Sequence, residues 1–180
     1  GVDAVAASGY KGLLSIEGGG FLYIADNLLE KLHPCSAGPN PALVINRVNG
    51  TWTCKDELDA RKLEAGTLPF HTIYCLHKSL QMLKRIGMDE ISSYVEQCYQ
   101  YVSEGLKKLG YQIDTPEDHH CHSMLVVAEK KEEMADYFQQ KGIFFTAGHG
   151  NHVRNEVGPF TSEDDIKKLL AAAADWKSRL

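Results

Sequence analysis

The chain has 180 residues, 43% of them hydrophobic and 24% charged, with a formal net charge of −5. This size and composition are typical of a globular protein with one sizeable core. The negative charge argues against a nucleic-acid or anionic-membrane surface, because like charges repel. The sequence also has no apolar run of membrane-spanning length and no signal-peptide pattern at its start. We therefore expect neither nucleic acid nor a membrane as a partner.

The five cysteines are scattered and odd in number, without CxxC spacing. This pattern indicates reduced thiols of an intracellular protein, not a disulfide framework or a zinc site. We expect a cytoplasmic location, with an organelle as the open alternative.

The first third of the chain predicts two strands joined by a lysine-containing loop. Residues 2–7 and 21–24 are apolar runs typical of strands, and Gly18–Gly20 allow close backbone packing before the second run. Residues 26–33 predict a short helix that begins with an aspartate cap and ends before a proline. Residues 35–70 carry several glycines and prolines and little periodicity. We expect them to form a long connection that crosses a surface or a partner subunit.

From about Pro69 onward the pattern predicts a small α/β sandwich. Apolar residues at three- and four-residue steps predict one helix that ends at Gly87 and a second that ends at Gly110. The last helix has Thr161 and Asp164 in capping-box spacing at its start. Between these helices we expect, in chain order, strands at 111–114 and 123–128, a helix around 134–138, and strands at 143–147 and 152–157.

Lys11 lies in the loop "SGYKGLLSIEGGG", between the first two predicted strands. Most lysines are simply solvated at the surface. A lysine fixed near apolar walls, however, can lose its proton and form a Schiff base with a carbonyl cofactor. The residues alone leave both interpretations open.

Three further motifs have both a structural and a functional interpretation. The segment "EAGT", which contains Gly66 and Thr67, is either a turn or a phosphate cradle of backbone N–H groups and a hydroxyl. Arg154 lies in a predicted strand, where it forms a surface ion pair or binds a carboxylate. The loop "GHGNH" at 148–152 is a solvated turn or offers histidines for acid–base chemistry.

The histidine-rich stretch "DHHCHS" at 118–123 raises the question of a metal site. In an extended segment, His119 and Cys121 face one way, whereas His120 and His122 face the other. Neither face alone offers the three or four ligands that a zinc site needs. We therefore expect no metal here, and a metal-binding protein is the minor alternative.

In order and spacing, these motifs resemble the C-terminal half of the class V aminotransferase family. These pyridoxal-phosphate enzymes of fold type I include cysteine desulfurases and isopenicillin-N-epimerase-like proteins. Asp3, "SGYK" and "GGGFLYI" occupy the places of the family's Asp, its S-x-H-K motif and the glycines and strand that follow. "EAGTLPF" is similar to the family's Glu-x-Gly-Thr segment, and "HVRNEVGPFTSEDDIKKL" to its terminal arginine strand and helix.

The resemblance covers nearly the whole chain and implies an α/β fold in two parts. Residues 1–68 would form the end of the fold-type-I large domain together with the connecting segment. Residues 69–180 would form a small C-terminal α/β sandwich domain.

The resemblance also implies roles for single residues. Lys11 would hold pyridoxal 5′-phosphate covalently and later move the proton at the substrate Cα, and Ser8 would bind the cofactor phosphate. Tyr10 stands where the family often has a histidine, and its phenol can donate the same hydrogen bond to phosphate. Gly66 and Thr67 would reach the phosphate of a neighbouring subunit's cofactor, which implies a homodimer.

Arg154 would clamp the α-carboxylate of an amino-acid substrate in a bidentate pair. The resemblance thus implies transamination, epimerisation or elimination on an amino acid. Desulfurases place a nucleophilic cysteine on a loop shortly before the arginine strand, whereas the stretch "QQKGIFFTAGHGNHVR" contains none. Desulfurase activity is therefore disfavoured.

In this family the aromatic residue that stacks on the cofactor ring, and the aspartate that pairs with its pyridine nitrogen, belong to a preceding half. We therefore expect the chain to be the C-terminal part of a longer enzyme and to be inactive alone. The alternative is a non-enzymatic α/β interaction module of the same ancestry. A pure scaffold, however, would need none of Lys11, Thr67 and Arg154.

Overall fold

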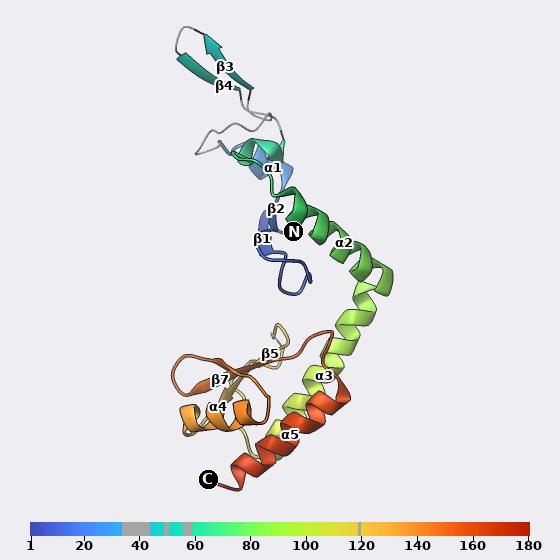
Figure 1. Cartoon of the computed structure of the whole chain (residues 1–180), viewed down its shortest axis with the longest axis vertical. Helices are drawn as coiled ribbons and strands as arrows, with labels where there is room; N and C mark the ends of the chain where they lie inside the picture. Colours follow the sequence, from blue (N-terminus) through green and yellow to red (C-terminus); the bar gives the residue numbers. More distant parts are fainter. Residues whose placement is uncertain (34–43, 49–50, 56–58, 119) are drawn as a thin grey trace. The chain divides into compact units, whose positions relative to one another are not determined.

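The structure is a computed structural model that describes residues 1–33, 44–48, 51–55, 59–118 and 120–180. The chain divides into two compact units, Gly1–Arg85 and Ile86–Leu180, and Figure 1 labels most of their elements. The domain boundary expected between residues 68 and 69 stays a prediction. Each unit is described in turn.

The first unit begins with the predicted hairpin. Strands β1 (Ala4–Ser8) and β2 (Gly20–Ile24) pair antiparallel, with Ala4 opposite Ile24 and Ser8 opposite Gly20. The helix expected over 26–33 is shorter than predicted, because α1 spans only Asp26–Leu29. Its N-cap is Ala25 and not Asp26, which instead places a negative charge in the first turn, where the helix dipole favours it.

A second hairpin lies within the segment expected to be an irregular connection. Strands β3 (Val44–Val48) and β4 (Thr51–Lys55) pair antiparallel, with Val48 opposite Thr51. The expectation of a long connection did not include this hairpin, which valine, isoleucine and threonine residues on either side of an Asn-Gly pair favour. The remaining parts of the expected connection, at 34–43, 49–50 and 56–58, lie outside the described residues.

A 3-10 helix, η1 (Ala60–Leu63), then leads toward α2. The side chain of Asp59 caps it by accepting a hydrogen bond of 2.9 Å from the Arg61 N–H. Lys62 is only 4% exposed, and its Nζ donates a 2.6 Å hydrogen bond to the Leu29 carbonyl at the end of α1. This bond satisfies a buried ammonium and fastens η1 to α1.

The two long helices are confirmed. Helix α2 spans Phe70–Ile86. Its buried residues, Thr72, Ser79 and Leu83, lie on one face of the helix. Helix α3 spans Met88–Lys108, and Gly110 ends it with a φ of +81°. No described helix is long and apolar enough to cross a lipid bilayer.

The second unit combines α3 with a small sheet and two further helices, which confirms the predicted α/β sandwich. Strand β5 (Ser123–Val127), helix α4 (Lys131–Gln140), strands β6 (Thr146–Ala147) and β7 (His152–Glu156), and helix α5 (Glu163–Lys177) follow in order. The sheet is antiparallel with the order β5-β7-β6. Helix α5 packs along α3 (Figure 1).

The core of this unit is formed by apolar side chains from all three helices and from one face of the sheet. Its completely buried members include Val102, Met124, Met134, Phe138 and Val153. Burial of such side chains removes apolar surface from water and is the main stabilising term of the unit.

Three local predictions in this unit need correction. Residues 111–114 form only an isolated bridge, from Ile113 to Val126, and the strand expected over 143–147 is confined to Thr146–Ala147. The capping box lies one residue later than predicted, because Ser162 and Asp165 exchange the two hydrogen bonds. Serine and aspartate satisfy the free backbone N–H groups here as well as the predicted pair would.

Candidate functional site

The loop that carries Lys11 is closed by its own backbone. The Gly9 N–H donates to the Gly19 carbonyl at 2.8 Å, and the Ser15 N–H donates to the Gly9 carbonyl at 2.9 Å. The Leu14 N–H donates to the Lys11 carbonyl at 2.8 Å. These bonds hold Lys11 at a fixed place beyond the end of β1.

Glycine lets this loop pack against α2 and β1. A Cβ at Gly20 would lie 2.5 Å from the Ala7 carbonyl oxygen, and a Cβ at Gly19 would lie 3.1 Å from Thr72. The Ser79 hydroxyl adds a 2.6 Å hydrogen bond to the Leu14 carbonyl. The glycine cluster therefore permits the close backbone approach that the sequence predicted.

The Lys11 side chain is exposed in this chain, and its Nζ lies 5.9 Å from the centre of the Tyr10 ring. No carboxylate lies within ion-pair distance of it among the described residues. A Cβ at the adjacent Gly12 would meet no atom within 4 Å. The amine is therefore accessible to a reactant.

Ser8 lies beside a cavity of about 670 Å³ within the first unit. Other walls of the cavity come from β2, from η1 and from Glu64 and Leu68. Gly66 and Thr67 lie between these two residues on the chain, and both are exposed. The structure therefore brings Ser8, Tyr10 and Lys11 together on one loop, whereas Gly66 and Thr67 belong to a second segment that contributes to the same cavity through its neighbours.

Arg154 lies on the exposed face of the second unit's sheet. Burial alternates along β7, so that Val153 and Asn155 are buried and Arg154 is exposed. Leu125 of β5 and Thr146 of β6 are its cross-strand neighbours. The guanidinium forms an ion pair with Glu156 at 2.9 Å, so its other N–H donors remain available for a second carboxylate.

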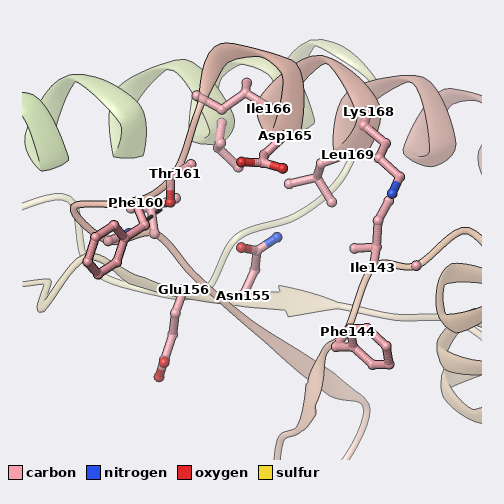
Figure 2. Close-up of a pocket in the computed structure, with 14 residues that line it drawn as sticks. Ile143, Phe144, Asn155, Glu156, Phe160, Thr161, Asp165, Ile166, Lys168 and Leu169 are labelled. Carbon is pink, nitrogen blue, oxygen red and sulfur yellow. Dashed lines mark hydrogen bonds between the residues drawn. The ribbon is translucent and has the colours of Figure 1, made fainter. Parts of the chain in front are cut away.

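The opposite face of β7 borders a pocket of about 360 Å³ beneath α5. Figure 2 shows Asn155 pointing toward Asp165 and Leu169 of α5, whereas Glu156 points away from them. Phe144 and Phe160, which flank the pocket, are mostly exposed. Asn155 gives no sequence signal of its own and becomes notable only because β7 carries it inward.

The histidine loop at 148–152 is structured by an ion pair. His152 Nε2 lies 2.6 Å from Oδ2 of Asp114. This hydrogen bond holds the pKa of Asp114 below its usual range and, together with a bond to the His149 carbonyl, raises the pKa of His152. His152 is thus engaged with Asp114, and the pair accounts for this histidine without a catalytic role.

The stretch at 118–123 places two histidines beside a carboxylate from another element. His120 and His122 converge on Glu96 of α3; His119 lies outside the described residues. The expectation against a metal considered ligands from this stretch only. Glu96 is 24 residues from His120, and no local signal links them.

Among the cysteines whose side chains the structure describes, Cys75, Cys98 and Cys121 are free. Cys121 is exposed and lies just before β5. The first residue of β5, Ser123, pairs with Glu156, so Cys121 lies near the Glu156 end of β7. The turn at 148–151 precedes His152, which pairs with Val127 at the other end of β5. The two ends of β5 are four residue steps apart, roughly 13 Å. Cys121 and the turn at 148–151 therefore lie at opposite ends of the β5–β7 pair.

Comparison with known proteins gives the family. The sequence matches the profile of the family described as Aminotransferase class-V over residues 1–169. The chain belongs to the class V aminotransferases. Enzymes of this family use pyridoxal 5′-phosphate. The predicted resemblance is therefore confirmed.

Among curated relatives, a probable cysteine desulfurase of Borreliella burgdorferi is 34% identical over 109 residues, which cover 61% of this chain and 25% of that protein. The uncharacterized aminotransferase YcbU of Bacillus subtilis is 28% identical over 94% of this chain and 44% of its own length. The chain of this class V aminotransferase thus spans less than half the length of these curated relatives.

Among solved structures, the apo cysteine desulfurase of Thermococcus onnurineus NA1 superposes with a TM-score of 0.88 at 19% identity, covering 99% of this chain and 48% of that one. At this identity the likeness shows the fold. It confirms the fold-type-I architecture predicted for this class V aminotransferase chain.

Proposed function

We propose that this chain supplies the lysine, phosphate-binding and carboxylate-binding parts of a pyridoxal-phosphate enzyme that acts on an amino acid. The observation that carries the proposal is the Lys11 loop, where an accessible amine is fixed three residues from the Ser8 hydroxyl by backbone bonds and by α2. The family to which the chain belongs supports the same cofactor.

The described residues fit this cofactor. Ser8 borders a cavity, Gly12 has open space around it, and Lys11 has no competing carboxylate among the described residues. When bound, pyridoxal phosphate supplies an electron sink for charge at the substrate Cα. Lys11 would hold the cofactor through Nζ and move the Cα proton, and Ser8 would donate a hydrogen bond to the phosphate.

Tyr10 is an additional phosphate donor in this proposal. Its side chain is exposed beside Lys11, and its hydroxyl can donate as the family's histidine does. Arg154 would bind the substrate α-carboxylate, because its exposed guanidinium offers donors beyond those used by Glu156.

We further propose a homodimer in which Gly66 and Thr67 serve the cofactor of the neighbouring subunit. Both residues are exposed, and a Cβ at Gly66 would meet no atom within 4 Å, so a phosphate can approach the backbone closely. The chain would be the C-terminal part of a longer, cytoplasmic enzyme. Its coverage of less than half of each curated relative supports this part of the proposal.

For the reaction, we favour transamination, epimerisation or elimination over cysteine desulfuration. A desulfurase needs a nucleophilic thiol on the loop before the arginine strand, and residues 139–154 contain no cysteine. Cys121 lies next to the Glu156 end of β7, roughly 13 Å along the strand from that loop. The names of the desulfurase relatives therefore do not by themselves assign this activity.

Reductive labelling tests the proposal. The longer protein is incubated with pyridoxal phosphate, reduced with borohydride, and mapped by peptide mass spectrometry; the 180-residue chain is labelled in parallel. We expect one adduct on Lys11, which Lys11→Ala abolishes. Lys78→Ala is the matched control, because Lys78 is also an exposed lysine of the first unit.

An adduct that persists on other lysines in the Lys11→Ala variant, with an unchanged cofactor spectrum, would disprove the assignment of Lys11. Labelling of the longer protein but not of the shorter chain would support the proposal that the chain is only part of the site.

A further inference from the structure

Three potential metal ligands converge within the second unit, from two elements. Glu96 lies on α3, and His120 and His122 lie on the segment that enters β5. Oε1 of Glu96 is 3.7 Å from Nε2 of His120, and Oε2 is 3.4 Å from Nε2 of His122. One ligand atom from each residue can be chosen so that all lie within 4.8 Å of one another.

These separations approach those of a bound metal. With bonds of about 2.0–2.2 Å, a tetrahedral Zn²⁺ separates its ligand atoms by roughly 3.3–3.6 Å. Only small side-chain movements would therefore bring the three groups onto one ion. Two imidazole nitrogens and a carboxylate oxygen suit Zn²⁺ and neighbouring transition metals, whereas Mg²⁺ and Ca²⁺ prefer oxygen alone.

The imidazole of His120 is held in place by its neighbours. It stacks on the ring of Tyr99, with centroids 3.8 Å apart and an interplanar angle of 6°. Tyr99 is itself buried in the core, and the His120 side chain is only 12% exposed. The rotamer that aims Nε2 at Glu96 is therefore fixed in advance, which lowers the entropy cost of binding an ion.

His122 is held by an unusual backbone conformation. Its φ of +55° is in the left-handed region, which is uncommon for residues other than glycine. The Val157 N–H fixes this conformation by donating to the His122 carbonyl at 3.1 Å. With this conformation, His122 lies beside His120 at the Glu96 carboxylate. Backbone strain of this kind is often found at binding sites.

We propose that Glu96, His120 and His122 form a binding site for a divalent transition metal such as Zn²⁺. Three protein ligands leave the fourth position to water, as in other two-histidine, one-glutamate sites. The ligands are partly exposed, which gives the ion a route of entry. The bound ion fastens the start of β5 to α3, two elements that a long stretch of chain separates.

Binding changes one weak contact. The His122 N–H lies 3.4 Å from Nδ1 of His120, a long hydrogen bond in which Nδ1 is the acceptor. Metal on Nε2 requires the His120 proton to be on Nδ1, so this contact opens as the ion binds. Acid weakens binding, because protonated imidazole is not a ligand.

Metal titration of the purified chain, first freed of metal with a chelator, tests the site. Zn²⁺ alone is titrated by calorimetry, and Co²⁺ alone by visible absorption, which reports the coordination geometry. We expect one ion per chain and a higher thermal unfolding midpoint with Zn²⁺. The visible bands of Co²⁺ should be those of a four-coordinate site.

Three variants remove one ligand each: Glu96→Gln, His120→Ala and His122→Asn. Asparagine tolerates a positive φ, so His122→Asn removes the imidazole without straining the backbone, and Glu96→Gln keeps the side-chain shape. We expect each variant to lower the Zn²⁺ affinity by about tenfold or more. Glu104→Gln on α3 and His77→Asn on α2 are matched controls, since both residues are exposed and outside the cluster.

Cys121→Ser separates this site from adventitious thiol binding, because Cys121 is exposed between the two histidines. We expect it to retain the affinity of the wild-type chain. Absence of stoichiometric Zn²⁺ binding in the wild type would overturn the proposal. So would equal affinity in the ligand variants and controls, or loss of binding in Cys121→Ser alone. Circular dichroism of each metal-free variant identifies any that is misfolded, and the remaining ligand variants then decide.

Discussion

Ser79 of α2 donates a 2.6 Å hydrogen bond to the Leu14 carbonyl, on the loop that carries Lys11. The bond joins residues 65 positions apart and ties the loop that carries Lys11 to α2. We expect Ser79→Ala to cost about 1 kcal/mol, because the Leu14 carbonyl loses its partner. Chemical denaturation measures this change, and the yield of the pyridoxal adduct on Lys11 should fall with it. Ser93→Ala, at an exposed position of α3, is the control, and equal unfolding free energies in both variants would refute the role of Ser79.

Gly20→Ala tests the close approach of β1 and β2. The new Cβ would lie 2.5 Å from the Ala7 carbonyl oxygen, and backbone on both strands would have to move. We expect a loss of about 1–3 kcal/mol in the free energy of unfolding. Gly12→Ala should stay within about 0.5 kcal/mol of wild type, because its Cβ would meet no atom within 4 Å. A Gly20→Ala chain as stable as Gly12→Ala would show that the hairpin accommodates a methyl group here.

Arg154→Lys tests the proposed carboxylate clamp in the longer enzyme. Lysine keeps the positive charge but cannot form a planar bidentate pair. We expect KM for amino-acid substrates to rise by roughly 10- to 100-fold, with little change in cofactor binding. Steady-state kinetics and the cofactor absorption spectrum measure the two effects separately. Arg179→Lys, at another arginine with an acidic partner, should leave KM unchanged. Identical kinetics in both variants would remove Arg154 from the substrate site.

The Asp114–His152 pair predicts a pH dependence of stability in the second unit. The hydrogen bond to Asp114 raises the pKa of His152, so this stabilisation is complete below about pH 6.5, the value for an unfolded histidine, and is lost as the pH rises through the raised pKa. The same bond lowers the pKa of Asp114, so its contribution is present above about pH 3.9 and is lost as the pH falls through the lowered pKa. The pair therefore stabilises the unit most between these limits.

NMR titration of the His152 ring measures this effect. In Asp114→Asn the pKa of His152 should fall, because the charged partner is gone. Asp118→Asn, at an exposed carboxylate four residues after Asp114, should leave it unchanged. If His152 titrates identically in wild type and Asp114→Asn, the ion pair is absent in solution.

Features that depend on neighbouring residues can be predicted from the sequence. The Lys11 loop is specified within 13 residues, from Ser8 to Gly20, because a strand, a turn and a glycine cluster follow one another directly. The long helices α2 and α3 follow from apolar periodicity and end at glycines that the backbone requires. The motifs that resemble the class V aminotransferase family are local as well, so the sequence alone indicates the family.

Prediction was weaker where several local solutions have similar energies. The last helix has two adjacent polar pairs that can form a capping box, and the choice of Ser162 with Asp165 depends on how the chain enters α5. The β3–β4 hairpin lies in a segment that was predicted only as a long connection, although its Asn-Gly pair is a hairpin signal. The glycines and prolines around it are equally typical of an irregular loop, so the sequence did not favour the hairpin clearly.

Contacts between residues that are distant in the sequence follow from the packing of the folded chain. Asn155 faces α5 and Arg154 faces outward because β7 pairs with β5 in one register, and a shift by one residue would exchange them. Glu96 reaches His120 and His122 because α3 passes beside the entry to β5. Such contacts depend on the packing of elements that are far apart in sequence, and no local pattern of residue types encodes that packing.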